Sequence, residues 1–277
     1  SKILELIIKM KLLKPAKKSL GQNFLIDKNI INKIVNISKV EEKSTILEIG
    51  SGYGNLTEEI IKAGPKKIYA IEKDKEIFFY LKRKFESNKN LKLINDDIFN
   101  ILKKNVFGKN IIVFGNLPYN ISTQILASFI INSKQKPWFK ILVFMFQKEV
   151  ADRIIAKSGE KEFGRLSILV NWKLDVKKHF NVSRNCFFPK PKVDSTILSF
   201  TPKIQNKYKI KKPKNLETVT RILFSARRKM INKSFVKLFG SKKLIAKKLG
   251  LDLNLRPEKI SKEMFYKITL EYEKLFN

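Results

Sequence analysis

The chain has 277 residues, 43% of them hydrophobic, and no apolar run long enough to cross a membrane, so we expect a soluble, globular protein without a membrane partner. Its 58 Lys and Arg residues against 25 Asp and Glu give a net charge of +33, which attracts polyanions and above all nucleic acid. The single cysteine, Cys186, and the single histidine, His179, exclude an internal disulfide, a multi-cysteine zinc site and a histidine-based metal cluster; we interpret both as structural.

The chain begins with a basic extension, residues 1–17. Its apolar residues recur at helical spacing among charged ones, which predicts a short amphipathic helix or a partly ordered tail rather than a signal peptide. We expect a catalytic α/β domain over residues 18–202. A basic, proline-containing linker then leads into a helical domain, so residues 203–277 are predicted to form a small C-terminal RNA-binding domain.

From Thr45 to Phe146, short β-rich runs alternate with helical patterns, which is typical of a doubly wound, mainly parallel sheet. The strands are predicted at residues 45–50, 66–74, 91–98, 111–116 and 140–146. The helices between them are predicted at residues 56–64, 75–87 and 122–131. Residues 166–182 and 195–200 are predicted to be later strands that close the same sheet. From Leu216 onward the pattern is helical only.

A glycine-rich loop follows the first of these strands. Gly50, Gly52 and Gly54 stand between a strand and a helix, where glycine permits a tight turn and a close approach to a ligand. Glu72 follows the second strand, at a spacing that suits an acid binding ribose hydroxyls. After the third strand, Asp97 and Ile98 are placed to bind an adenine amino group and ring.

Two cofactors share this layout, a dinucleotide and S-adenosylmethionine. A dinucleotide needs a helix N-terminus for its pyrophosphate. A sulfonium ligand has no phosphate and suits an acidic pocket, and Glu48, two residues before Gly50, adds a third acid to Glu72 and Asp97. We therefore predict S-adenosylmethionine as the cofactor, with no metal, in a Rossmann-like α/β methyltransferase domain.

The fourth strand ends in the sequence Asn116-Leu117-Pro118-Tyr119. Adenine's amino group is a poor nucleophile, and the Asn116 side chain and the Leu117 carbonyl could accept its two N–H bonds and aim it at a methyl group. Pro118 would fix the direction of that carbonyl, and Tyr119 would stack on a base taken out of its helix. The alternative interpretation is that Asn and Pro form a turn while Tyr caps the core.

Eight segments, in order, resemble the motifs of the small-subunit (16S) ribosomal RNA adenine N6,N6-dimethyltransferases: SLGQNFLID, LEIGSGYGNLT, AIEKD, NDDI, FGNLPYNIST, FQKEVADR, FGRLSIL and FFPKPKVDS. The match runs from about Lys18 to Ser199. The resemblance implies that Phe187 sandwiches the target base opposite Tyr119; the alternative is a core phenylalanine before a proline-rich turn. It also implies that the cofactor is contacted by Asn23, Leu25, Gly50, Glu72, Asp97 and Asn116.

In the helical tail, the segment LFSARRKMINKSF resembles a basic helix of the same family. We expect Arg227, Arg228, Lys229 and Lys233 to bind RNA phosphate, although a basic helix face is by itself usually only solvated. The resemblance implies transfer of methyl groups to the N6 atoms of two adjacent adenosines in the 3′-terminal stem-loop of 16S rRNA.

The expected partner is a small ribosomal subunit precursor, bound in the cytoplasm by a monomeric enzyme. Two alternatives stay open: a resistance-type methyltransferase acting on large-subunit RNA, and a largely non-catalytic assembly factor. The sequence NLPYNIST and the basic helix argue against the first alternative, and the intact glycine and acid positions argue against the second.

Overall fold

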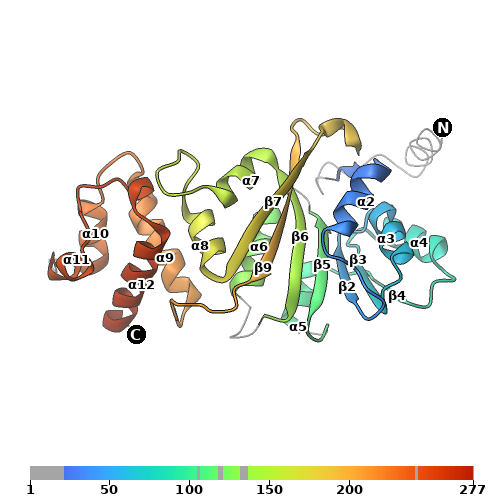
Figure 1. Ribbon diagram of the computed structural model, residues 1–277, viewed down its shortest axis with the longest axis horizontal. Helices are drawn as coiled ribbons and strands as arrows, with labels where there is room; N and C mark the ends of the chain where they lie inside the picture. Colours follow the sequence, from blue (N-terminus) through green and yellow to red (C-terminus); the bar gives the residue numbers. More distant parts are fainter. Residues whose placement is uncertain (1–21, 105–106, 118–120, 132–136, 241–242, 277) are drawn as a thin grey trace. The chain divides into compact units, whose positions relative to one another are not determined.

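The computed structural model describes residues 22–104, 107–117, 121–131, 137–240 and 243–276 (Figure 1). The basic extension at residues 1–17 lies outside the described residues, as do Pro118 and Tyr119 of the predicted site. The chain divides into two compact units, residues 1–151 with 177–202 and residues 152–176 with 203–277. In the parts of the chain that are described, no helix has both the length and the apolar character needed to cross a membrane.

The first unit is organised by a seven-stranded sheet in the order β4-β3-β2-β5-β6-β9-β7. The strands from β2 to β6 pair in parallel, and β9 runs antiparallel to β6. Because the chain adds β3 and β4 on one side of β2 and then β5 and β6 on the other, the strand order reverses between β2 and β5. The mainly parallel sheet predicted from the sequence is therefore confirmed. Its strands are β2 (Thr45–Ile49), β3 (Lys67–Ile71), β4 (Leu91–Ile94), β5 (Ile111–Asn116), β6 (Phe139–Gln147), β7 (Leu174–Val182) and β9 (Ser195–Pro202).

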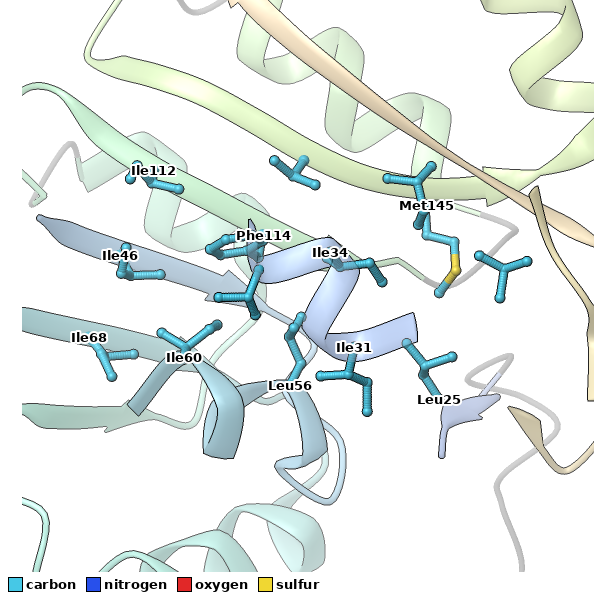
Figure 2. Close-up of a cluster of buried hydrophobic side chains, with 14 of the residues drawn as sticks. Leu25, Ile31, Ile34, Ile46, Leu56, Ile60, Ile68, Ile112, Phe114 and Met145 are labelled. Atoms are coloured by element: carbon cyan, nitrogen blue, oxygen red, sulfur yellow. The ribbon is translucent and has the colours of Figure 1, made fainter. Parts of the chain in front are cut away.

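Helices connect and cover these strands. The three helices predicted between the strands are confirmed as α3, α4 and α6, while α2, α5 and α7 were not predicted. Figure 2 shows Ile31 and Ile34 of α2 beside Leu56 and Ile60 of α3, packed against strand residues such as Phe114 in one buried cluster. The helices are α2 (Lys28–Asn36), α3 (Asn55–Lys62), α4 (Lys75–Lys84), α5 (Ile98–Lys104), α6 (Ser122–Ile131) and α7 (Lys148–Ile155).

A second, two-stranded sheet lies beside the first. Its strands are β1 (Phe24–Leu25) and β8 (Phe187–Phe188), which follows a 3-10 turn at Arg184–Cys186. The two strands are antiparallel, with Leu25 opposite Phe187. This pairing joins the start of the described chain to a segment about 160 residues later, a contact that no local pattern in the sequence indicates.

The second unit is helical, as predicted, but it begins earlier in the chain than the sequence indicated. Residues 166–173 were predicted to be strand, and this prediction is wrong because Arg165–Lys173 forms helix α8. The run is apolar on several sides, and Ile168, Val170 and Trp172 are all buried. Such a run lacks the apolar stripe of a surface helix, so its sequence pattern is equally typical of a buried strand. The later helices are α9 (Pro213–Leu223), α10 (Asn232–Phe239), α11 (Lys243–Leu249) and α12 (Lys262–Phe276), with 3-10 turns at Phe224–Ala226 and Pro257–Lys259.

Hydrogen bonds explain why α8 belongs with the later helices. The Trp172 indole Nε1 donates to the Tyr208 carbonyl at 3.0 Å, and the Tyr266 hydroxyl donates to the Ile168 carbonyl at 2.8 Å. The Glu273 carboxylate, on α12, accepts from the backbone N–H groups of Lys211 and Lys212 just before α9. Buried polar groups of α8, α9 and α12 are thereby satisfied within one unit.

Candidate active site

The glycine loop lies where the strand order reverses, which is where open α/β sheets bind ligands beyond the carboxyl ends of their strands. Gly50 and Gly52 follow β2 with φ angles of +74° and +53°, in the left-handed region that favours glycine. A Cβ atom on Gly52 would lie 2.8 Å from Phe24 Cδ1, so the missing side chain lets β1 pack directly on the loop. Across the sheet, a Cβ on Gly50 would lie 3.4 Å from the Asn116 carbonyl oxygen at the end of β5.

A cavity of about 80 Å³ opens at this point of the sheet. It is far smaller than the roughly 300–1,000 Å³ typical of small-molecule pockets. Glu48, Ser51 and Asn55 also line the cavity, although none of them was assigned a contact from the sequence. Of the predicted site residues, the cavity brings together Asn23, Leu25, Gly50, Gly52, Asn116 and Leu117.

Ser51 provides a test of whether this cavity suits a polar cofactor. Its hydroxyl oxygen is buried and makes no well-formed hydrogen bond to the described residues, although the hydroxyl lies near enough to the Glu48 carboxyl to lower the pKa of that group. A buried polar atom without a partner is costly, and a bound ligand with a donor or acceptor would relieve that cost. The glycine backbone and this hydroxyl therefore fit the amino-acid end of S-adenosylmethionine.

Glu48 lies beneath the cavity. Successive side chains of a strand face opposite sides of the sheet, so Glu48 shares the face of Ile46 and points toward α3. There the Thr57 hydroxyl donates to Glu48 Oε2 at 2.6 Å, and only 1% of Glu48 is exposed. Burial raises the pKa of Glu48 to about 8, an effect that the Thr57 and Ser51 hydroxyls and the Lys84 charge oppose and the Glu72 charge reinforces. At neutral pH Glu48 is therefore mostly protonated.

Glu72 follows β3, and its carboxylate is used by the glycine loop. Glu72 Oε2 accepts from the Gly52 N–H at 2.9 Å, and Oε1 accepts from the Asp74 N–H at 2.8 Å. Burial raises the pKa of Glu72, while these backbone hydrogen bonds act in the opposite direction. The predicted ribose-binding acid is thus held rigidly at the entrance to the loop, outside the cavity itself.

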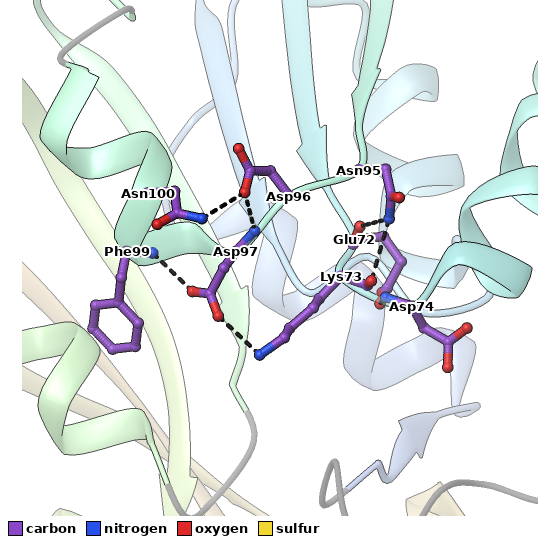
Figure 3. Close-up of polar contacts among 8 residues, drawn as sticks. All are labelled: Glu72, Lys73, Asp74, Asn95, Asp96, Asp97, Phe99 and Asn100. Atoms are coloured by element: carbon purple, nitrogen blue, oxygen red, sulfur yellow. Dashed lines mark hydrogen bonds and ion pairs between the residues drawn. The ribbon is translucent and has the colours of Figure 1, made fainter.

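Asp97 and Ile98 follow β4, one strand further along the edge (Figure 3). The Lys73 ammonium pairs with Asp97 Oδ2 at 2.9 Å, and the Phe99 N–H donates to Oδ1 at 3.0 Å. Burial alone would raise the pKa of Asp97, but these two hydrogen bonds lower it below its ordinary value. Asn95 ties β4 to β3 by donating to the Glu72 carbonyl at 2.8 Å, and Ile98 is buried. These residues extend the acidic edge beyond the cavity.

Asn116 ends β5, and its side-chain amide has a hydrogen-bond partner among the described residues. Asn116 Nδ2 donates to the Asn23 carbonyl oxygen at 3.2 Å. The next residue, Leu117, is 2% exposed, and a Cβ on Gly115 would lie 2.7 Å from its side chain. The Leu117 side chain is therefore packed into the interior of the sheet, directly beside Gly115.

Phe187 lies in the interior rather than on an open surface. Its side chain is 3% exposed and belongs to the same buried cluster as Leu25 and Met145. The neighbouring Phe188 is partly buried and packs on the other side of β8, in a cluster with Phe24 and Tyr53. The structure therefore gives Phe187 a core position, and stacking on a base would require one face of its ring to open.

A second cavity lies in the helical unit, with a volume of about 500 Å³. Arg228, Lys229 and Lys233, three of the cations predicted to bind RNA phosphate, line it and are exposed. The cavity also includes two cations that the sequence argument missed, Lys237 and Arg256. Lys237 follows Lys233 at helical spacing and could have been found from the sequence, whereas Arg256 lies in a separate loop.

Arg227 differs from its neighbours. Its guanidinium donates to the carbonyls of Lys161 and Phe163, the second at 2.8 Å, and pairs with Glu258 at 3.3 Å. These bonds fasten three separate segments of the helical unit together. The structure therefore favours a structural role for Arg227 over the predicted contact with RNA.

The sheet is mainly parallel, with a glycine loop after β2, acids after β3 and β4, and an asparagine at the end of β5. These features define a Rossmann-like, class I S-adenosylmethionine-dependent methyltransferase domain, which is followed here by helices. The family model described as "Ribosomal RNA adenine dimethylase" matches residues 14–274. The chain belongs to this family.

Similar proteins carry related names. The chain is 51% identical over 260 residues to "Ribosomal RNA small subunit methyltransferase A" of Pelagibacter ubique, covering 94% of this chain and 98% of the relative. A protein of the same name from Wolbachia sp. subsp. Drosophila simulans is 36% identical over 269 residues, covering 96% of each chain.

Two solved structures resemble about nine-tenths of the chain. A dimethyladenosine transferase from Plasmodium falciparum superposes with a TM-score of 0.73 at 29% identity, covering 91% of this chain and 98% of the other. The 23S rRNA methyltransferase ErmE superposes with a TM-score of 0.68 at 19% identity, covering 90% of this chain and 99% of the other. At that identity, the second likeness shows a shared fold alone.

Proposed function

We propose that this protein transfers methyl groups from S-adenosylmethionine to the N6 atoms of two adjacent adenosines in the 3′-terminal stem-loop of 16S rRNA, dimethylating each. One observation supports the proposal above all others. Asn116, which ends β5, and the glycine loop after β2 line the same cavity, where the strand order reverses, in a chain of the ribosomal RNA adenine dimethylase family.

The cofactor would be held along the edge of the sheet. Asn23, Leu25, Gly50 and Gly52 line the cavity, which suits the methionine end of S-adenosylmethionine. Glu72 would accept from the ribose hydroxyls, and Asp97 and Ile98 would contact the adenine amino group and ring. When bound there, S-adenosylmethionine supplies an electrophilic methyl group.

The protein's own contribution to the reaction is to position the amine. The Asn116 side-chain oxygen and the Leu117 carbonyl accept the two N–H bonds of the target amino group, so that its lone pair points toward the methyl group. The described residues supply no histidine or cysteine for proton transfer at this turn, and none is needed for a mechanism based on orientation. Pro118 would fix the turn, while Tyr119 and Phe187 would hold the flipped base.

Binding of the RNA would depend on the basic cavity of the helical unit. Arg228, Lys229 and Lys233 offer exposed cations to phosphate, and the net charge of +33 favours long-range attraction to ribosomal RNA. We propose that the natural substrate is an assembling small ribosomal subunit, bound in the cytoplasm by a monomeric enzyme.

The decisive experiment supplies labelled S-adenosylmethionine to unmethylated small subunits, with large subunits and bare RNA assayed in parallel. We expect label in N6,N6-dimethyladenosine of the small subunit. Label in large-subunit RNA would instead support the resistance-type activity, and binding to small subunits without transfer would support an assembly factor.

A variant at Asn116 tests the mechanism itself. Asn116→Ala removes the side-chain acceptor, and we expect transfer to fall by about 100-fold or more, in the range seen when one oriented hydrogen-bonding group is lost from an active site. Binding to small subunits should be kept, because the basic cavity is untouched. Transfer at the wild-type rate would refute the role of this oxygen.

A further inference from the structure

A short extended segment, residues 22–26, crosses one side of the cavity and is here called the strap. Phe24 and Leu25 pair with β8, and the Ile26 N–H donates to the Cys186 carbonyl at 2.9 Å. In an extended strand the backbone groups of successive residues point to opposite sides. Because Ile26 faces β8, the carbonyls of Leu25 and Asn23 face away from it.

Two asparagine side chains satisfy those carbonyls. Asn55 Nδ2, from the first residue of α3, donates to the Leu25 carbonyl at 2.7 Å. Asn116 Nδ2, from the end of β5, donates to the Asn23 carbonyl at 3.2 Å. The outer edge of the strap is therefore held by two side-chain amides in place of a neighbouring strand, and both asparagines line the cavity.

The bond to Asn23 also determines how the Asn116 amide is turned. A carbonyl oxygen can only accept, so the NH₂ group of Asn116 must face the strap. Its Oδ1 is then directed away from the strap carbonyl and is available to accept a hydrogen bond from a substrate amino group. The strap thus selects the amide orientation that the proposed reaction needs.

The strap is anchored by packing as well as by these bonds. The Phe24 ring lies 4.7 Å from the Tyr53 ring, centroid to centroid, and directly over Gly52. The Leu25 side chain lies in the buried cluster near Ile31 and Met145 (Figure 2). Packing fixes where these two side chains sit, whereas the hydrogen bonds fix the direction of the backbone carbonyls between them.

From these contacts we infer that Asn55 is a positioning residue: it holds the strap in register so that the Asn23 carbonyl orients the Asn116 amide for methyl transfer. This inference deepens the proposed function and depends on it for the final catalytic step. The consequence for cofactor binding does not depend on it, because the strap carries the Asn23 and Leu25 positions that line the cavity.

Asn55→Asp is the sharpest test, because it keeps the shape of the side chain and removes the N–H donor. A carboxylate at the first turn of α3 is also favoured by the helix dipole, so the helix should not be weakened. Asn32→Asp is the matched control, since it makes the same change at an exposed position of α2. The two proteins are compared by calorimetric titration with S-adenosylhomocysteine and by thermal unfolding.

We expect Asn55→Asp to bind S-adenosylhomocysteine about tenfold more weakly than Asn32→Asp, since it loses one hydrogen bond and places a charge against a carbonyl. The thermal midpoint of Asn55→Asp should fall only slightly, because one hydrogen bond is lost while the helix dipole favours the new charge. A merely structural role for Asn55 would lower the midpoint and leave the affinity of the folded protein unchanged. Equal affinity in the two proteins would overturn the inference.

A double-mutant cycle tests whether Asn55 acts through Asn116. If both amides hold one strap, the loss of affinity in Asn55→Asp combined with Asn116→Ala will be smaller than the product of the two single losses. If the double variant loses affinity by the full product of the two single fold-losses, Asn55 and Asn116 act independently and the coupling is refuted. Because calorimetry needs no RNA, a failure of methyl transfer by the wild-type protein would count against the proposed function and leave this result unaffected.

Discussion

Replacing Glu48 by glutamine should make the protein more stable, increasingly so as the pH rises. In the folded protein Glu48 has a pKa of about 8 against an ordinary value of 4.5, chiefly because it is buried. A raised folded-state pKa means that stability is fully present below about pH 4.5 and is lost as pH rises toward 8, because the unfolded chain then releases a proton that the folded chain retains. Glutamine does not ionise, so the variant escapes this loss.

The difference of 3.5 pKa units corresponds to about 5 kcal/mol at 1.36 kcal/mol per unit, an upper bound because the surroundings of an ionised Glu48 relax. The charges of Lys84 and Glu72 act on an ionised Glu48 but not on a neutral glutamine, and their effect is already contained in the pKa of about 8. Thr57 can still donate to the amide oxygen of the variant.

The assay is urea unfolding of wild-type and Glu48→Gln protein, followed by fluorescence, between pH 5 and pH 9. We expect the two free energies of unfolding to be close at pH 5 and to diverge with pH up to about pH 8. The exposed variant Glu86→Gln is the control and should stay within about 0.5 kcal/mol of the wild type at every pH. If the difference in free energy of unfolding between Glu48→Gln and the wild type does not change with pH, the conclusion that Glu48 is buried in its protonated form is wrong.

The two neighbouring arginines of the helical unit should give opposite results. Arg227→Ala should lower the free energy of unfolding by about 2 kcal/mol, because hydrogen bonds are lost, and should therefore lower the thermal midpoint. It should affect RNA binding little. Arg228→Ala should leave the thermal midpoint unchanged and weaken binding to small-subunit RNA. The slope of the logarithm of the binding constant against the logarithm of the salt concentration should become shallower by about one. The reverse pattern would show that Arg227 is the phosphate ligand. On α12, Glu273→Ala should destabilise the protein by about 2 kcal/mol, because it removes the partly buried carboxylate that accepts from two backbone N–H groups before α9, as thermal unfolding would reveal. Glu271→Ala, which removes only exposed pairs with lysines, should cost less than about 1 kcal/mol, and equal losses for both glutamates would refute the capping role.

The sequence by itself determined the elements that have a strong local signal. Alternating β-rich and helical patterns predicted β2 to β6 and the helices α3, α4 and α6 correctly, because continuous apolar strands and amphipathic helices have different periods. The positions of Gly50 and Asn116 after their strands were equally clear. Parallel strands have their carboxyl ends at one edge, so the sequence also implied that these residues would meet.

Local pattern did not identify α8. Its apolar residues are buried on several sides, and a helix of this kind has no one-sided period to distinguish it from a buried strand. Its assignment to the helical unit follows from the bonds of Trp172 and Ile168 with residues in the later part of the chain.

Only the tertiary structure decided the partners of the polar groups. Asn116 and Asn23 are 93 residues apart in the chain, and Arg227 lies 64 residues from Phe163, so neither contact has a local signature. The protonation of Glu48 likewise depends on how completely α3 and the sheet exclude water from it. Residue type and spacing specify which chemistry a site can perform, whereas the direction of an amide and the charge of a buried acid are set by the atoms that long-range folding places beside them.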